Sequence, residues 1–371
     1  MRAPDCLVRL LFALACGLLL PVTQAFAEAP CRVAFDMGSS GIRAGASNSS
    51  AVTRSSIDYL APLRAGRGLD EVIEPTIEAL RELPQQAGFS PDCLRVGGGF
   101  SAWRLALQHD AGKLVASLGR IHAQSGVAVL VIPQRVEGAY GYYGARKLLG
   151  ERLTSSHVLD IGGGSLQVAG ERTAFGQALG QKIWHQKLCQ AIRHTTEQPC
   201  ALQPMTRRQL ARARALLSTE LHGIGSALPE KVSMTAISRP VTHGVAPAVA
   251  HLLGKPAHEE QLARRDLTAA IGKLARLTPK QATARLKLPH QHAPYLLSDM
   301  LLVEGLMQAT RGQTLQIAEV DLTNLPGLLE DDRAFQWGGN YGCYLERLWQ
   351  LGLQAYTSDP ATCHAAGLPS R

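Results

Sequence analysis

Short apolar runs alternate with amphipathic stretches along residues 31–150. The apolar runs end at turn residues, which predicts buried strands at 31–36, 94–97 and 127–132. Between them, apolar residues recur at helical spacing, which predicts helices at 70–88, 101–118 and about 136–150. Strands that alternate with helices are typical of an α/β protein built on a mainly parallel sheet.

The same pattern restarts near residue 157. An apolar strand at 157–160 enters a glycine turn, and residues 166–169 form the second arm of a hairpin. The first strand of each half ends in an aspartate, Asp36 or Asp160, and a Gly/Ser turn follows it. Later elements are predicted as two helices in 259–288, a helix at 294–310 and a strand at 315–320. The repetition predicts a duplicated α/β lobe, at 28–152 and 153–350, followed by a tail at 351–371.

The first 27 residues have the composition of a secretory signal peptide. Arg2 and Arg9 precede an apolar run at 10–20, and Ala25-Phe26-Ala27 supplies a small-x-small cleavage site. The apolar run is too short to span a bilayer comfortably, although a retained anchor is the alternative. We therefore expect cleavage after Ala27 and a periplasmic or secreted protein.

The cysteine content agrees with export. Cys6 and Cys16 leave with the signal peptide, and the six that remain are Cys31, Cys93, Cys189, Cys200, Cys343 and Cys363. An even number in an exported chain predicts disulfides, with 15 pairings open to six cysteines. Cys189 and Cys200 flank a short polar stretch, and Cys343 and Cys363 can tie the tail to the last helix. The alternative is six reduced thiols in a chain that is not exported.

Composition and charge restrict the class of partner. Hydrophobic residues make up 46% of the chain, which excludes wholesale disorder. The net charge is +8, and removing two Arg and one Asp with the signal peptide leaves +7 on the mature chain. This charge suits an anionic ligand. Because basic residues are not interleaved with aromatic ones, we expect no nucleic-acid partner. We also expect no membrane association after signal cleavage, and leave a homodimer open.

An aspartate at a strand end followed by a Gly/Ser turn suits phosphate chemistry. Glycines let the backbone approach a ligand closely, and successive N–H groups of such a turn form an anion-binding nest. The aspartate can hold a hard cation directly or through water. One such turn is often only a tight turn, but two matched turns, one per lobe, predict a phosphate site in a cleft between the lobes.

These residues resemble the Ppx/GppA family of exopolyphosphatases and guanosine pentaphosphate phosphatases, within the actin-like ATPase superfamily. The turns at 36–43, Asp-Met-Gly-Ser-Ser-Gly-Ile-Arg, and 160–165, Asp-Ile-Gly-Gly-Gly-Ser, are similar to the two phosphate loops of that family. Residues 101–104, 132–144 and 293–329 resemble three further family segments. The resemblance implies two actin-like, ribonuclease H-like lobes with a phosphate-binding cleft between them. The chain looks like a short form without the C-terminal helical domain of long members.

The resemblance also implies roles for individual residues. Glu137 matches the glutamate that activates the attacking water, and Arg43 and Arg104 match arginines that hold phosphate oxygens. Asp36 and Asp160 match the carboxylates on the metal side, which implies Mg²⁺ or Mn²⁺ as the cofactor. The phosphate-binding positions are Gly38, Ser39, Ser40, Gly162, Gly163, Gly164 and Ser165. The alternatives are an exposed glutamate at a helix start and solvated surface arginines.

The resemblance implies one disulfide as well. In an actin-like lobe the first and fourth strands are parallel neighbours, so Cys31 and Cys93 would start adjacent strands within bridging distance. With Cys189–Cys200 and Cys343–Cys363, this gives three predicted pairs.

One departure from the family bears on activity. Gln167 stands where the family usually has a glutamate, and an amide is a poorer Mg²⁺ ligand and no base. On this basis we expect Gln167→Glu to restore the carboxylate and to leave activity equal or higher.

The sequence favours the hypothesis that the protein is an exported phosphohydrolase, which releases terminal phosphate from polyphosphate or a related phosphoanhydride. Water would attack the end phosphate with Mg²⁺ assistance. An alternative is a catalytically impaired polyphosphate- or nucleotide-binding protein on the same fold, which Gln167 supports. A kinase of the same superfamily is less favoured, because no adenosine loop is evident in 236–245.

Overall fold

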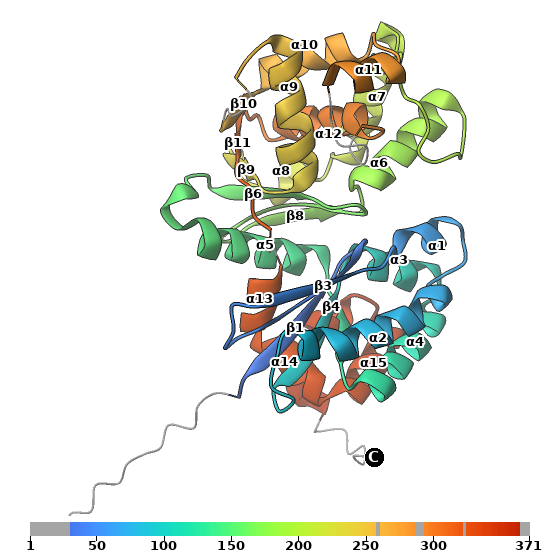
Figure 1. Ribbon diagram of the computed structural model, residues 1–371, viewed down its shortest axis with the longest axis vertical. Coiled ribbons are helices and arrows are strands. Elements are labelled where there is room, and N and C mark those ends of the chain that lie inside the picture. Colours follow the sequence, from blue (N-terminus) through green and yellow to red (C-terminus); the bar gives the residue numbers. More distant parts are fainter. Residues whose placement is uncertain (1–29, 257–259, 287–292, 322–323, 364–371) are drawn as a thin grey trace, which may run out of the picture. The chain divides into compact units, whose positions relative to one another are not determined.

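The computed structural model describes residues 30–256, 260–286, 293–321 and 324–363 (Figure 1). The predicted signal peptide and its cleavage site lie outside these residues. Within the described part of the chain, no helix is both long enough and apolar enough to cross a membrane.

The first sheet has five strands in the order β3-β2-β1-β4-β5. The strands are β1 (Arg32–Met37), β2 (Gly41–Ala46), β3 (Val52–Ser56), β4 (Leu94–Gly99) and β5 (Ala128–Val131). The first three form an antiparallel meander, whereas β4 and β5 run parallel to β1. The predicted neighbours β1 and β4 are therefore confirmed. Near the carboxyl end of β1, Asp36 lies opposite Arg43 of β2 and Gly98 of β4.

Helices connect and cover these strands. They are α1 (Leu60–Arg64), α2 (Asp70–Gln86), α3 (Ser101–His109), α4 (Ala111–Ser125) and α5 (Gln134–Leu149). The stretch predicted as one helix over 101–118 is two helices. Asp110 adopts an extended conformation and its carboxylate accepts a hydrogen bond from the Lys113 N–H at 2.9 Å, which caps α4.

The second sheet repeats the arrangement of the first. Its order is β10-β11-β9-β6-β7-β8, with β6 (His157–Ile161), β7 (Leu166–Gly170), β8 (Ala174–Gln177), β9 (Met234–Ala236), β10 (Gln261–Ala263) and β11 (Thr314–Ile317). Like β1, β6 has an antiparallel hairpin partner on one side and a parallel strand on the other. The predicted duplication of an α/β lobe is confirmed by this topology.

Helices of the second lobe pack around a mainly apolar core. They are α6 (Gln181–Leu188), α7 (Arg207–Glu220), α8 (Ile224–Ala227), α9 (Ala246–Leu253), α10 (Arg264–Leu274), α11 (Pro279–Leu286) and α12 (Leu296–Ala309). The predicted helix at 294–310 is α12, most of whose residues are buried. The predicted strand at 315–320 is shorter, because β11 ends at Ile317.

The C-terminal helices return to the first lobe. They are α13 (Leu325–Glu330), α14 (Asp332–Gly339), α15 (Tyr341–Leu351) and α16 (Gln354–Thr357). In Figure 1 these red segments lie beside the blue strands, and their buried residues join the core of the first sheet. Two tyrosine hydroxyls bond the backbone of β5: Tyr341 donates to the Val129 carbonyl at 2.9 Å, and Tyr344 accepts from the Val131 N–H at 2.7 Å. Residues 325–350, which we expected in the second lobe, therefore belong to the first.

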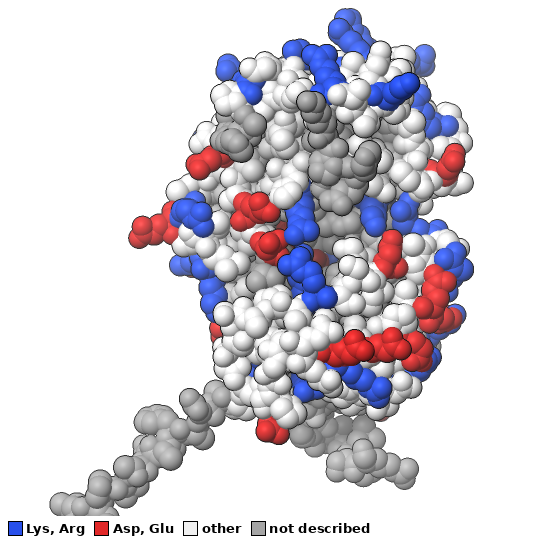
Figure 2. All heavy atoms as spheres, viewed as in Figure 1, with Lys and Arg blue, Asp and Glu red and all other residues white. Residues whose placement is uncertain are grey.

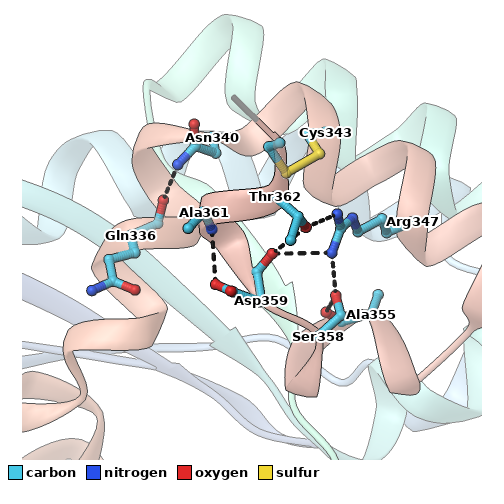
Figure 3. Close-up of a disulfide and its surroundings, with 10 residues drawn as sticks. Gln336, Asn340, Cys343, Arg347, Ala355, Ser358, Asp359, Ala361 and Thr362 are labelled. Carbon is cyan, nitrogen blue, oxygen red and sulfur yellow. Dashed lines mark hydrogen bonds between the residues drawn. A yellow bond between two sulfur atoms is a disulfide. The ribbon is translucent and has the colours of Figure 1, made fainter. Parts of the chain in front are cut away.

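The three predicted cysteine pairs are disulfides in the structure. Cys31–Cys93 joins the starts of β1 and β4, and Cys189–Cys200 closes a short loop after α6. Cys343–Cys363 ties α15 to the end of the described chain (Figure 3). Beside it, Arg347 donates to the Ser358 hydroxyl at 2.9 Å and to the Asp359 carbonyl at 3.1 Å. The last turn is thus held by a covalent bond and by charge-assisted hydrogen bonds.

Candidate active site

The two Asp-Gly/Ser turns meet in one cleft. A Cβ at Gly163 would lie 2.7 Å from the Ser39 hydroxyl oxygen, and one at Gly164 would lie 3.0 Å from that of Ser101. Real Cβ atoms are essentially never as close as the first of these distances, so Gly163 is what allows the turns of the two lobes to touch. Between them lies a cleft of about 250 Å³.

Most of the predicted site residues line this cleft. They are Asp36, Gly38, Ser39, Ser40, Arg43, Glu137, Asp160, Gly162, Gly163 and Ser165. These residues come from β1, β2, α5, β6 and the two turns, which lie far apart in sequence. Two predicted site residues, Arg104 and Gly164, are not among those lining the cleft.

Glu137 lies in the first turn of α5, where the helix leaves β5 and packs against β7. In Figure 1 this helix runs between the two sheets. The Glu137 Oε2 atom accepts hydrogen bonds from Arg104 Nη2 at 2.6 Å and from Gln167 Nε2 at 2.8 Å. Burial raises the pKa of the Glu137 carboxyl above its usual value, and Arg104 and Ser165 oppose that rise. The result is a carboxylate at the cleft that is fixed in position and more basic than one in water.

Arg104 lies beneath the cleft rather than in it. Its side chain is 2% exposed, with Nη1 donating to the Ile132 carbonyl at 2.7 Å and Nη2 donating to Glu137 and, at 3.0 Å, to Ser165 Oγ. We expected this guanidinium to hold phosphate oxygens. In the structure it pairs with Glu137 inside the protein, because the start of α3 lies behind the Gly/Ser turns.

Gln167 belongs to the same buried network. It lies on β7 directly opposite Asp160 in the hairpin register and is 3% exposed. Its Nε2 donates to Glu137 and, at 3.0 Å, to Ser165 Oγ. A carboxylate has no hydrogen to donate, so only the amide makes these two bonds unless a bound cation or proton intervenes. Gln167 is therefore a donor matched to Glu137, which the sequence did not indicate.

Asp36 and Asp160 place two carboxylates on the cleft. Burial raises the pKa of Asp36 to about 6, Arg43 acts against this rise from 3.9 Å, and Glu137 adds to it. Asp160, at the end of β6, is partly exposed. Oxygen ligands of this kind suit Mg²⁺ or Mn²⁺, and a cation would favour the ionised form of the desolvated Asp36. The residues present therefore fit a divalent cation.

Several lining residues were not predicted from sequence as site residues. They are Ser101, Ser238, Arg239, Asp321 and Asn324. Arg239 pairs with Asp321 at 2.8 Å, and Ser238 Oγ accepts from the Ile161 N–H at 3.0 Å. Ser238 and Arg239 follow β9, a parallel neighbour of β6 whose carboxyl end reaches the same sheet edge. Strand β9 has only three residues, which are too few for a periodic pattern to reveal it in the sequence.

A second group of metal-ligating atoms lies in the second lobe. His185, Cys189 and Cys200 have ligand atoms within 4.8 Å of one another. The two sulfurs are joined as a disulfide, so they are not thiolate ligands in this state. These three buried residues therefore belong to the packed interior of the second lobe.

Comparisons with known proteins agree with the geometry. The sequence model of the Ppx/GppA phosphatase family matches residues 110–324. A search of curated proteins finds no match. Among solved structures, the Ppx/GppA family member of Aquifex aeolicus is 16% identical, with 81% of this chain and 96% of that chain covered and a TM-score of 0.59. An exopolyphosphatase from Cytophaga hutchinsonii is 14% identical, with 81% and 96% covered and a TM-score of 0.57. These similarities show the same two-lobed, actin-like fold.

Proposed function

The chain belongs to the Ppx/GppA phosphatase family, and from that premise we propose that it is an exported exopolyphosphatase-like hydrolase. Its reaction is the release of terminal phosphate from polyphosphate or a related phosphoanhydride. The observation that carries this proposal is the convergence of both Asp-Gly/Ser turns and the buried Glu137 on one cleft.

In this reaction Glu137 is the general base. A water oxygen attacks the terminal phosphorus, the water proton passes to the Glu137 carboxylate, and the bond from phosphorus to the bridging oxygen breaks. Arg104, Gln167 and Ser165 position Glu137 through the bonds described above. Arg43 and the N–H groups of the two turns bind the oxygens of the terminal phosphate, where charge is rearranged in the transition state.

Asp36 and Asp160 would hold Mg²⁺ or Mn²⁺. The cation, when bound, supplies positive charge that offsets the charge of the phosphate oxygens. The raised pKa of Asp36 supports this assignment, because a desolvated carboxylate without a cation is costly to ionise.

We also propose that residues 1–27 direct export, so that the mature protein is periplasmic or secreted. Three disulfides support this proposal, since they persist in oxidising compartments. Polyphosphate is then a better substrate than guanosine pentaphosphate, which is a cytoplasmic compound. The positive charge of the mature chain suits a long polyanion.

The test is phosphate release from polyphosphate by the mature protein, with and without Mg²⁺. Glu137→Gln is nearly isosteric and removes the base, so we expect a loss of roughly 10²–10⁴-fold in rate with binding retained. Glu151→Gln, at an exposed glutamate, is the matched control and should keep the parental rate. A Glu137→Gln variant as active as the parent would contradict the assignment of the base.

A binding protein without hydrolysis is the second candidate. The observation that favours it is the close ion pair between Glu137 and Arg104, which opposes the rise that burial causes in the pKa of the base. Polyphosphate that binds with Mg²⁺ present but is not hydrolysed would decide for this candidate.

A further inference from the structure

A second cavity, of about 220 Å³, adjoins the catalytic cleft. Asp36, Gly38, Ser40, Arg43 and Arg239 line both cavities. Arg54, on β3, adds a third guanidinium, and we name the space around Arg43, Arg54 and Arg239 the arginine compartment. None of the described residues that line it is aromatic, so it offers no aromatic ring on which a nucleobase would stack.

Like charges face each other across two strands of the arginine compartment. Arg43 on β2 is directly opposite Arg54 on β3 in the antiparallel register. Like charges in this relation destabilise a sheet. Arg43 has Asp36 at 3.9 Å, whereas the Arg54 guanidinium has no ion-pair partner among the residues that the structure describes. An anion bound beside both guanidinium groups would remove the repulsion.

The third guanidinium comes from the second lobe. Arg239 follows β9 and pairs with Asp321 at 2.8 Å, with its side chain 48% exposed. Arg239, Arg43 and Arg54 each lower the pKa of Asp321, so all three positive charges act on the same carboxyl group. Three guanidinium groups face two carboxylates, Asp36 and Asp321, so the compartment carries excess positive charge. A cation on Asp36 would increase that excess. Figure 2 shows basic side chains beside acidic ones in the middle of the face that it presents.

We propose that the arginine compartment binds the phosphate groups that follow the terminal one in a linear polyphosphate, an inference that rests on the proposed function. The terminal phosphate lies between the two turns, beside Glu137. The chain then passes Arg43 and continues toward Arg54 and Arg239, whose planar forks match phosphate oxygens. The compartment thereby selects chains of phosphate over a single phosphate group.

Calorimetric titration in the Glu137→Gln background tests this assignment without turnover. The two probes are tripolyphosphate and orthophosphate. Adding Arg54→Ala or Arg239→Ala should weaken tripolyphosphate binding about tenfold, the loss of one charge-assisted contact. In Arg54→Ala, orthophosphate binding should change by less than about twofold, because Arg54 does not line the catalytic cleft. Arg207→Ala, at an exposed arginine of α7, removes the same charge and should leave both affinities within that range.

Two results would overturn the inference. One is tripolyphosphate that binds no more tightly than orthophosphate. The other is parental tripolyphosphate affinity in both arginine variants. Hydrolysis is measured separately, as phosphate release by the parental protein with Mg²⁺. Arginine-dependent binding without release supports the arginine compartment and contradicts only the proposed hydrolase.

Discussion

At the scale of single residues, the buried network around Glu137 decides what the cleft can do. Glu137, Arg104, Ser165 and Gln167 are each less than 10% exposed and hydrogen-bonded to one another. In such surroundings a charge is tolerated only with partners, and electrostatic interactions are stronger than in water. Burial therefore raises the pKa of the base, and Arg104 and Ser165 oppose that rise.

Gln167→Glu tests this network. From sequence we expected the change to leave activity equal or higher, but the structure places the new carboxylate against Glu137 Oε2, where Gln167 Nε2 is now 2.8 Å away. Two adjacent carboxylates disfavour ionisation of both, so the pKa of Glu137 should rise further. We expect kcat/KM at pH 7 to fall about tenfold or more and the acidic limb of the pH profile to move to higher pH.

The control for that change is Gln308→Glu, which adds the same charge at an exposed position of α12. It should leave the pH profile in place. Unchanged or increased activity in Gln167→Glu would mean that the carboxylate binds the metal ion, as the family pattern suggests, and that the amide is not required.

At the scale of elements, two of the disulfides close loops of very different length. Cys31 and Cys93 are 62 residues apart and join β1 to β4, whereas Cys189 and Cys200 are 11 apart. In the chain-entropy model, the first stabilises by roughly 4 kcal/mol and the second by roughly 3 kcal/mol. We therefore expect Cys31→Ser/Cys93→Ser to cost more unfolding free energy than Cys189→Ser/Cys200→Ser, as measured by denaturant unfolding. The reverse order would show that local packing outweighs loop closure.

Helix α6 carries a buried histidine that makes stability depend on pH. His185 is fully buried, contacts Ser298 Oγ and the Cys200 carbonyl, and has its pKa lowered by burial to about 4. The unfolded state takes up a proton near pH 6.5 and the folded state only near pH 4, so stability is lost as pH falls through this window. The slope for one such group is at most about 1.4 kcal/mol per pH unit.

The comparison of parent with His185→Gln isolates this effect. Asp299, whose pKa burial raises, changes stability in the opposite direction, because its folded form retains a proton as pH rises. That contribution is common to both proteins. Denaturant unfolding at several pH values should show a shallower fall below pH 6.5 in His185→Gln, with exposed His222→Gln as the control. Parallel curves for parent and variant would contradict the assignment.

At the scale of the whole molecule, the site depends on the approach of the two turns. Gly163→Ala would place a methyl group 2.7 Å from Ser39 Oγ, so the turns must separate. Because small displacements of positioning groups reduce rates strongly, we expect kcat/KM to fall about 10²-fold.

The double variant Gly163→Ala/Ser39→Gly should recover part of that loss, since it removes the group that the methyl meets. The cycle of the two single variants and the double variant measures the coupling. Additive effects of the two changes would contradict a direct contact between the turns.

The sequence by itself determined the parts of this protein that depend on local pattern. Periodicity located most strands and helices, because side chains repeat every 2 residues in a strand and every 3.6 in a helix. The Asp-Gly/Ser pattern located the two turns that meet at the cleft, because only small residues allow such turns. The lengths of the helices were less well determined. Asp110 divides one predicted helix into two, because its side chain caps the second helix and this outweighs the continuous apolar spacing.

The tertiary structure alone decided the features made by contacts between distant segments. Arg104 lies under the cleft because Glu137, 33 residues later, and Ser165, 61 residues later, meet it there. The sequence suggests that Gln167 replaces a carboxylate of the family, whereas the structure shows that its amide donates hydrogen bonds to Glu137 and Ser165. Arg54 and Arg239 belong to different lobes, and helices α13–α16 return to the first sheet. No periodic pattern encodes these placements, because each results from packing between elements that the chain itself keeps far apart.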